Sequence, residues 1–310
     1  MSVAYLFPGQ GSQSVGMGRV LYEQHPEARA VFDQADKFLG YKLSELCING
    51  SVADLAQTNV QQPAIFVTSL AAWAVIESQA WPRADFVAGH SLGELTALTA
   101  AGCLSFVACL QLAQERGRLM AELSRPGSMA AILGLDEVAI IMALCKLVSA
   151  ETKQVVVLAN DNSPTQQVIS GETEAVRRVG ELVVKRGARR SVPLPISIAS
   201  HCSLMDDVAA EFSKVLATAP INTPRIPIIS NLTTGILFTV DQIRAELASQ
   251  LTECVRWRES MLMLRNLGVD TLVDVGPSDT LHKLMRRIDK TATRIHFDPT
   301  DAAYPLATDT

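Results

Sequence analysis

Residues 85–101, with the sequence DFVAGHSLGELTALTAA, decide the fold and the chemistry of this chain. The apolar run before Gly89 predicts a buried strand, and the run from Leu92 to Ala101 predicts a helix. The turn between them reads Gly-x-Ser-x-Gly, the pattern of a nucleophile elbow, in which a tight strand-to-helix turn exposes a serine hydroxyl. Larger side chains at the two glycines would collide with neighbouring backbone. We therefore predict that Ser91 is a nucleophile at a helix N-terminus, which favours an anionic intermediate. The alternative is a chance match in a glycine-containing turn.

Short apolar runs alternate with helical patterns outside this stretch as well, which is typical of an α/β fold. The N-terminal run, which stops at Pro8-Gly9, predicts a first buried strand. Further strands are predicted at 86–88, 227–229 and 272–275.

The middle of the chain has a different rhythm. Strands are predicted at 129–133, 155–159, 167–170 and 191–194, and helices at 136–149 and 173–186. The order β-α-β-β-α-β is that of a ferredoxin-like unit. We therefore predict a large α/β domain formed by residues 1–125 and 195–310, with a small ferredoxin-like subdomain, residues 126–194, inserted into it.

The composition is that of a globular protein that can bury a sizeable core, with 310 residues of which 48% are hydrophobic. The net charge is −5 and the cations are spread along the chain, so we expect no nucleic-acid partner. The six cysteines lack Cys-x-x-Cys spacing, and we expect reduced thiols, no metal and no cofactor.

The N-terminus lacks the basic head and the long apolar run of a signal peptide. Residues 95–114 contain no charged side chain, but Gly102 and several polar residues interrupt them. We therefore expect two helices rather than a membrane span. The scattered cysteines favour a cytoplasmic location, and a monomer is the default expectation.

A serine nucleophile needs a base, and the chain has five histidines. His201 is the candidate, because it follows a predicted strand at 196–198, where a loop can present a side chain to a cleft. A structural histidine is the alternative. We expect His90 to point away from Ser91 and to serve packing. Cys202 is expected to be a buried thiol, since adjacent residues of an extended segment face opposite ways.

The glycine-rich segment at residues 8–13 does not fit a nucleotide-binding loop, because it lacks the third glycine and the lysine of such loops. It does contribute to a family resemblance, carried by four segments in order: Phe7-Pro8-Gly9-Gln10-Gly11-Ser12-Gln13, Gly89-His90-Ser91-Leu92-Gly93-Glu94, Gln114-Glu115-Arg116-Gly117 and Ser200-His201-Cys202. Over residues 3–287 the chain resembles the malonyl-CoA:acyl carrier protein transacylases.

The resemblance implies an α/β-hydrolase-like large domain with a ferredoxin-like small one. It also implies a ping-pong reaction that serves fatty-acid or polyketide synthesis. Malonyl passes from malonyl-CoA to the serine, and then to the phosphopantetheine thiol of an acyl carrier protein.

Carried over by position, the resemblance implies Ser91 as nucleophile and His201 as base, with the backbone N–H groups of Gln10 and Leu92 facing the oxyanion. Arg116 would hold the malonyl carboxylate, a role that suits a planar guanidinium with two parallel donors. By pattern alone, an exposed helix arginine is an equal alternative.

Gln250 would help to orient the histidine. Asn162, in a predicted loop at 160–164, would be a polar contact near the cleft, and an ordinary Asx turn is the alternative. The chain departs from the family at Ser278, where Gly-Pro-Gly is frequent. It also matches neither a malonyl nor a methylmalonyl pattern at 198–201, so the α-substituent of the acyl group stays open, with malonyl the default.

Two other functions stay open. A serine hydrolase that removes acyl groups from carrier proteins could use the same elbow, but it has no use for a buried cation at Arg116. A non-catalytic scaffold is disfavoured by intact Ser91 and His201. Finally, the basic run Lys185-Arg186-Gly187-Ala188-Arg189-Arg190 is either a solvated helix end or a docking patch for an acidic carrier protein or coenzyme A phosphates.

Overall fold

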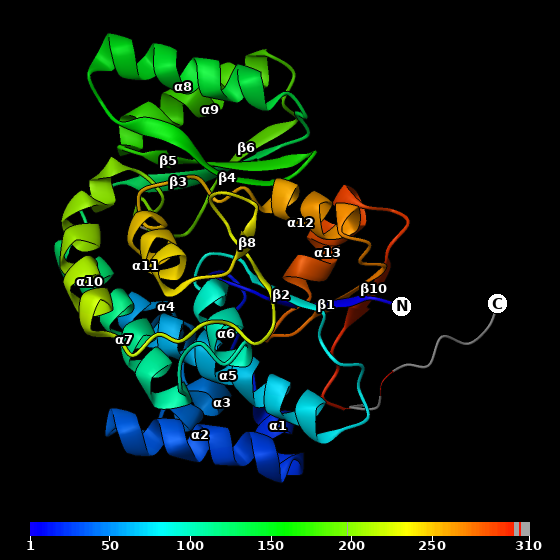
Figure 1. The fold of residues 1–310 in the computed structure, drawn as a ribbon. Helices are drawn as coiled ribbons and strands as arrows, with labels where there is room; N and C mark the ends of the chain where they lie inside the picture. Colours follow the sequence, from blue (N-terminus) through cyan, green and yellow to red (C-terminus); the bar gives the residue numbers. More distant parts are fainter. Residues whose placement is uncertain (197, 301–303, 305–310) are drawn as a thin grey trace.

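The structure is a computed structural model that describes residues 1–196, 198–300 and 304, and it contains two sheets (Figure 1). The larger sheet has the strand order β10-β9-β1-β2-β7-β8. Its strands are β1 (Val3–Phe7), β2 (Phe86–Gly89), β7 (Ile228–Ile229), β8 (Ile236–Leu237), β9 (Thr271–Asp274) and β10 (Thr293–His296). All neighbours are parallel except β7 and β8. The four strands predicted for this sheet are confirmed.

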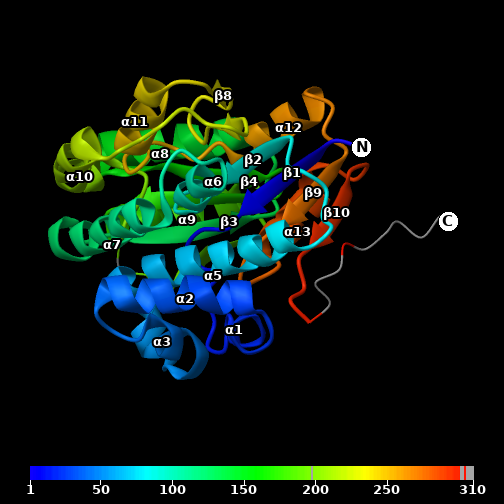
Figure 2. The same cartoon turned by 60° about the horizontal axis from the view of Figure 1, so that its bottom comes forward.

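The larger sheet is buried on both faces, as a parallel sheet requires. Along β1, Tyr5 and Phe7 pack into one apolar cluster, whereas Ala4 and Leu6 pack into another. The first cluster joins the sheet to α5 (Thr58–Ser78), α6 (Gly93–Ala100) and α7 (Phe106–Leu123). The second joins it to α12 (Trp257–Asn266) and α13 (Thr280–Ile288). In Figure 2, α12 and α5 lie on opposite sides of β1.

Further helices surround this part of the fold, and those of residues 19–56 pack outside α5 rather than on the sheet itself (Figure 1). These further helices are α1 (Arg19–Gln24), α2 (Pro26–Leu39), α3 (Leu43–Asn49), α4 (Val52–Ala56), α10 (Asp206–Thr218) and α11 (Val240–Ser249). The uncharged stretch 95–114 forms parts of α6 and α7, which a turn with Gly102 at φ 74° separates, so the prediction of two helices is confirmed. Among the described residues, no helix has both the length and the apolar character needed to cross a membrane.

The smaller sheet is antiparallel, with the order β4-β5-β3-β6. Its strands are β3 (Ser128–Leu133), β4 (Val156–Ser163), β5 (Gln166–Gly171) and β6 (Arg190–Pro193). Helices α8 (Val138–Thr152) and α9 (Thr173–Lys185) pack on one face of this sheet, at the top of Figure 1. The predicted fold class and the β-α-β-β-α-β order are confirmed. The proposed boundaries, 1–125 with 195–310 and 126–194, stay a prediction.

Two local predictions differ from the structure. The segment 160–164 is not a loop throughout, because β4 continues to Ser163. Its pairing with β5 shifts register at two points, Leu158/Asn160 and Asp161/Ser163, and such bulges allow polar side chains within a strand. The predicted strand at 196–198 includes residue 197, which lies outside the described residues, and Ile198 forms only an isolated bridge to Pro126.

The edge of β4 contacts the segment around the start of α12. The backbone N–H of Val255 donates to the Ala159 carbonyl at 2.9 Å, and that of Asp161 donates to the Val255 carbonyl at 2.9 Å. Arg258 forms an ion pair with Asp161, with 3.0 Å between Nε and Oδ2. These contacts hold the bulged end of β4 against the start of α12 and the residues that precede it.

Candidate active site

Ser91 lies in the turn between β2 and α6, in a conformation that non-glycine residues rarely adopt, with φ 52°. Such a conformation costs about 1–3 kcal/mol. A Cβ atom at Gly89 would lie 2.0 Å from the Gly93 carbonyl carbon, and one at Gly93 would lie 2.0 Å from the Phe7 oxygen. The glycines are therefore required by close backbone approach, as the sequence predicts for a nucleophile elbow.

His201 lies beside Ser91, with 3.0 Å between Nε2 and the serine Oγ. Its Nδ1 is 2.7 Å from the backbone carbonyl of Gln250. A carbonyl can only accept, so Nδ1 carries the proton and Nε2 is free to accept from the serine hydroxyl. Burial, with the nearby Arg116 charge, lowers the pKa of His201 to about 3, which keeps the imidazole neutral. This is the arrangement of a serine and its general base.

His201 is held in a strained backbone conformation of its own, with φ 62°. Its backbone N–H donates to the Leu251 carbonyl at 2.8 Å. Cys202 is buried, as expected, and burial raises the pKa of its thiol. The expectation that His201 and Cys202 face opposite ways because they lie in an extended segment was wrong, however. His201 adopts the left-handed conformation, so this segment is not extended.

Arg116 projects from α7 into the same site and is only 2% exposed. Its guanidinium donates to Gln62 Oε1 at 2.8 Å, to Gln250 Oε1 at 3.2 Å and to Ser91 Oγ at 3.3 Å. Across the described part of the chain, no carboxylate forms an ion pair with it. Burial lowers the pKa of Arg116 to about 10, an effect that the Glu94 charge opposes. A buried cation with neutral partners is poised to bind an anion.

Gln250 contacts three parts of the site. Its backbone carbonyl orients His201, its side-chain oxygen accepts from Arg116, and its side-chain nitrogen donates to the Ser91 carbonyl at 3.2 Å. The same nitrogen donates to a carboxyl oxygen of Glu94. The histidine is thus oriented through the backbone of Gln250, whereas its side chain ties the arginine to the nucleophile turn.

The two residues predicted to face the oxyanion come from separate segments. Leu92 directly precedes α6, and Gln10 follows β1. Within residues 1–196, 198–300 and 304, the backbone N–H groups of Gln10 and Leu92 form no hydrogen bond with a protein acceptor. The Gln10 side chain donates to Gln61 at 2.5 Å, beside a cavity of 230 Å³ that Ser200 and Pro195 also line.

Asn162 lies at the bulged end of β4, where its Oδ1 is 2.7 Å from His90 Nε2. The ring of His90 also packs edge-on against Trp257. His90 therefore packs, as expected, but it also makes a polar contact between the two sheets that the sequence prediction did not include. Burial lowers the pKa of His90, so the ring is neutral and donates from Nε2 to Asn162.

Two residues that contact the candidate site were not predicted from sequence. Glu94 is fully buried on α6, and Asn231, which follows β7, is 1% exposed. Asn231 bonds to the backbone on both sides of the nucleophile turn. A carboxyl group within an otherwise uncharged helix, and an amide at the end of a parallel strand, are the signals that could have indicated them.

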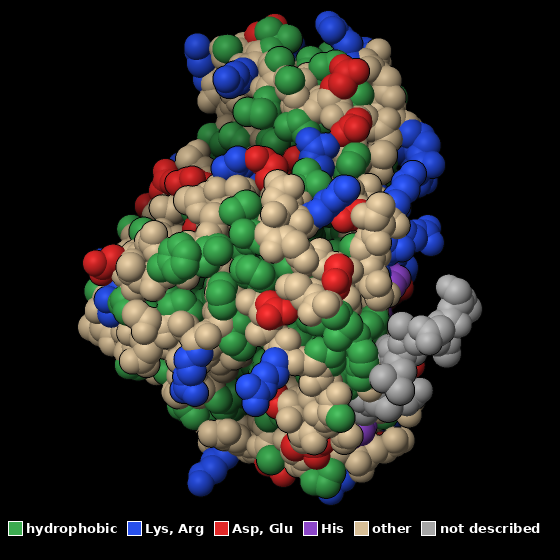
Figure 3. Space-filling model, turned by 45° about the vertical axis from the view of Figure 1, so that its right-hand side comes forward, with side chains coloured by type: hydrophobic (Ala, Val, Ile, Leu, Met, Phe, Trp, Pro, Cys, Tyr) green, Lys and Arg blue, Asp and Glu red, His purple; other side chains and the backbone are tan. Residues whose placement is uncertain are grey.

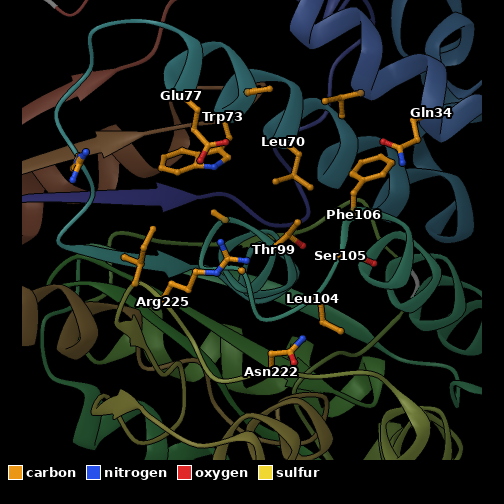
Figure 4. Close-up of a pocket in the computed structure, with 16 residues that line it drawn as sticks. Gln34, Leu70, Trp73, Glu77, Thr99, Leu104, Ser105, Phe106, Asn222 and Arg225 are labelled. Atoms are coloured by element: carbon orange, nitrogen blue, oxygen red, sulfur yellow. The ribbon is translucent and has the colours of Figure 1, made fainter.

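A cavity of 960 Å³ lies away from these residues, between α5 and the segment around Arg225 (Figure 4). Trp73 and Leu70 form an apolar wall, and Glu77, Asn222 and Arg225 supply polar groups. No predicted site residue lines it. In the part of the chain that is described, no cluster of three or more His, Cys, Asp or Glu side chains could hold a metal ion.

Comparisons with known proteins give a consistent result. A family model described as an acyl transferase domain matches residues 4–297. The malonyl CoA-acyl carrier protein transacylase of Bacillus subtilis is 40% identical over 292 residues, which are 93% of this chain and 90% of the relative.

Solved structures agree with the family match. An acyl carrier protein S-malonyltransferase from Vibrio cholerae is 39% identical and superposes with a TM-score of 0.91 over 96% of both chains. A malonyl transacylase in complex with its type II polyketide synthase acyl carrier protein is 37% identical, with a TM-score of 0.92 over 96% of both chains.

Proposed function

This chain belongs to the acyl transferase domain family, and we propose that it moves a malonyl group from coenzyme A to the thiol of an acyl carrier protein by way of an ester on Ser91. The reaction serves fatty-acid or polyketide synthesis. The relatives of this chain are named for this reaction, as a malonyl CoA-acyl carrier protein transacylase and an acyl carrier protein S-malonyltransferase.

In the first half-reaction, Arg116 binds the malonyl carboxylate and so places the thioester carbonyl over the serine. His201 accepts the hydroxyl proton as Ser91 Oγ bonds to that carbonyl carbon. The oxygen that becomes negative faces the free N–H groups of Gln10 and Leu92. The carbon–sulfur bond then breaks, and the coenzyme A sulfur leaves with the proton that His201 returns.

The second half-reaction runs the same steps with another thiol. His201 accepts the proton of the phosphopantetheine thiol, whose sulfur attacks the malonyl ester carbonyl. The ester bond breaks, Ser91 regains its proton from His201, and malonyl leaves as a thioester of the carrier protein. A neutral imidazole is required at the start of both halves, and the lowered pKa of His201 provides it.

One observation carries the proposal: a buried guanidinium with only neutral partners lies 3.3 Å from the hydroxyl that forms the ester. An acyl group that brings its own carboxylate supplies the missing counter-charge, whereas acetyl does not. Charge-assisted pairs of this kind are roughly twice as strong as neutral hydrogen bonds, which favours malonyl at the site.

The test uses labelled malonyl-CoA and acetyl-CoA in parallel, intact mass to detect the acyl-enzyme, and a holo carrier protein as acceptor. We expect a malonyl adduct that is absent in Ser91→Ala and that moves to the carrier. Rapid loss of the adduct to water would indicate a hydrolase instead. No adduct with either thioester would indicate a scaffold.

Several finer statements belong to the proposal. We take unsubstituted malonyl as the acyl group. Asn162, which His90 contacts, is proposed to bind the substrate. The boundaries of the small subdomain are proposed to lie at 125/126 and 194/195. We also propose that the chain works in the cytoplasm as a monomer, with no nucleic-acid or membrane partner. The basic run at 185–190 is proposed to receive the acidic carrier protein.

A further inference from the structure

Asn231 contacts the nucleophile turn from a segment far along the chain. Its Oδ1 accepts a hydrogen bond from the Ser91 backbone N–H at 2.9 Å, and its Nδ2 donates to the Gly89 carbonyl at 2.7 Å. The two backbone groups flank the His90 residue of the turn. We propose that Asn231 is a positioning residue that holds the backbone of the turn carrying the nucleophile. The inference rests on the proposed function in that Ser91 is the residue that is acylated.

The turn needs such support because it is strained and lies in a buried position. Ser91 has φ 52°, and its backbone N–H would lack an acceptor if the Asn231 side chain were removed. The next bonds of the turn, from Gly93 N–H to the His90 carbonyl and from Glu94 N–H to the Ser91 carbonyl, already belong to the start of α6. Asn231 therefore supplies the only side chain, among the described residues, that bonds to the backbone on both sides of the turn.

The orientation of the Asn231 amide follows from its partners. The Ser91 N–H can only donate and the Gly89 carbonyl can only accept, so the oxygen faces the first and the nitrogen faces the second. The second hydrogen on Nδ2 points to Glu94 Oε1 at 3.1 Å. An aspartate of the same shape would place an oxygen against two acceptors.

Glu94 connects this contact to the rest of the site. One of its carboxyl oxygens accepts from Asn231, and the other accepts from Gln250, which orients His201 and contacts Arg116. Glu246 is a second carboxyl near Glu94 and is itself fixed by Ser230, with 2.6 Å between the hydroxyl and the carboxyl oxygen. Burial and this second carboxyl raise the pKa of Glu94 well above its ordinary range. The nucleophile turn and the base are thereby tied to one buried network.

The test compares Asn231→Ala and Asn231→Asp with the unchanged protein in single-turnover acylation by malonyl-CoA. We expect the maximal acylation rate to fall about 100-fold, as for a small displacement of a reacting group, at an unchanged half-saturating malonyl-CoA concentration. Asn231→Asp keeps the shape and the acceptor for Ser91, so it reports on the lost donors even if Asn231→Ala does not fold.

Asn222→Asp is the matched control, because the Asn222 amide also donates to two backbone carbonyls, those of Cys103 and Pro220, in an exposed loop remote from Ser91. A folded Asn231 variant that acylates at the unchanged rate, or one that alters only the half-saturating concentration, overturns the inference. The same variants are treated with a fluorophosphonate, which reacts with an activated serine without needing malonyl. If the unchanged protein forms no malonyl ester, the proposed function fails, and the fluorophosphonate rates still decide the role of Asn231.

Discussion

Arg116 donates a hydrogen bond of 3.3 Å to the hydroxyl of Ser91, so the cation that is proposed to select the acyl group also touches the atom that receives it. Arg116 lies on α7, whereas Ser91 lies in the turn that precedes α6. We expect the malonyl carboxylate to compete with Ser91 for this donor and so to release the serine oxygen for attack.

Replacing Arg116 with alanine is expected to abolish the preference for malonyl. The kcat/KM for malonyl-CoA should fall about 100-fold, because charge-assisted hydrogen bonds to a buried cation are lost, while the value for acetyl-CoA changes little. Arg118→Ala is the matched control, since Arg118 lies on the same helix and forms exposed ion pairs with Glu115 and Glu122. A variant that still prefers malonyl would rule out this role for Arg116.

The kcat/KM for malonyl-CoA should not change with pH through ionisation of His201. The pKa of this base is lowered to about 3 by burial and by Arg116, so it stays neutral as the pH falls through the usual range for histidine. We expect kcat/KM for malonyl-CoA, which reports the free enzyme, to stay flat between about pH 5 and pH 8. An inflection near the ordinary histidine pKa would contradict the described geometry of the site.

The basic run on the small subdomain should affect only the carrier half-reaction. Arg190 pairs with Leu133 across β6 and β3, Leu133 pairs with Gln166 of β5, and Gln166 pairs with Ser163 of β4. These positions form one row across the small sheet, which links the basic run to Asn162, the residue before Ser163. Arg287 of α13 donates to Gln166 at 3.0 Å, and Figure 3 shows Lys and Arg side chains gathered along one edge of the visible face.

Reversing the charge in Arg189→Glu/Arg190→Glu is therefore expected to raise the KM for carrier protein roughly tenfold, because electrostatic attraction of an acidic partner is lost. Acylation of Ser91 by malonyl-CoA should be unchanged. Arg177→Glu/Arg178→Glu, on the same subdomain, is the control with an equal change in charge. Equal KM values in both double variants would count against a docking patch.

Asp274, fully buried on β9, should make the protein less stable as the pH rises. Its Oδ2 accepts from the His282 N–H at 2.8 Å, whereas its Oδ1 has no partner among the described residues, and burial raises the pKa of this carboxyl to about 8. The folded state thus holds the proton more tightly than the unfolded chain, whose aspartates titrate near pH 4. The stabilisation is complete below that value and is lost as the pH rises through about 8.

The measurement is urea unfolding of the unchanged protein and of Asp274→Asn at about pH 5 and pH 8. The free energy of unfolding of the unchanged protein should fall over this interval by a few kcal/mol more than that of the variant, which cannot ionise there. His296 lies 3.9 Å from Asp274 and Asp279 also faces the group, so their charges modify the size of the difference. Parallel pH dependences would show that Asp274 is not the group responsible.

The strands and the elbow with Ser91 could be predicted because each has a local signal, whereas the pattern left a structural alternative open for His201 and for Arg116, and the family resemblance favoured them. Gly89 and Gly93 flank a serine between an apolar strand and an apolar helix, and β3 to β6 follow one another within a short part of the chain. The alternation of apolar and polar residues within such segments shows which residues are buried, so each element can be predicted from its own sequence.

The hydrogen bonds of Asn231, Glu94 and His90 could not be predicted in the same way. Their contacts join segments that are distant in the sequence, as in the bond from Ser91 to Asn231 or that from His90 to Asn162. The polar residues around Asn162 favour a loop, because polar residues are uncommon in strands. The segment is nevertheless extended, since β4 pairs with β5 as far as Ser163 and Asp161 contacts both Val255 and Arg258.

The order of strands in the larger sheet also bears on how the protein is synthesised. Strand β1 lies between β2 and β9, so a growing chain can pair β1 with its second neighbour only after Thr271 has left the ribosome. Likewise, Ser91 is translated long before the Gln250 carbonyl that orients its base. A nascent chain therefore carries the serine before its proposed proton acceptor can be oriented, and we expect the ability to form an ester to appear only after Gln250 has been synthesised.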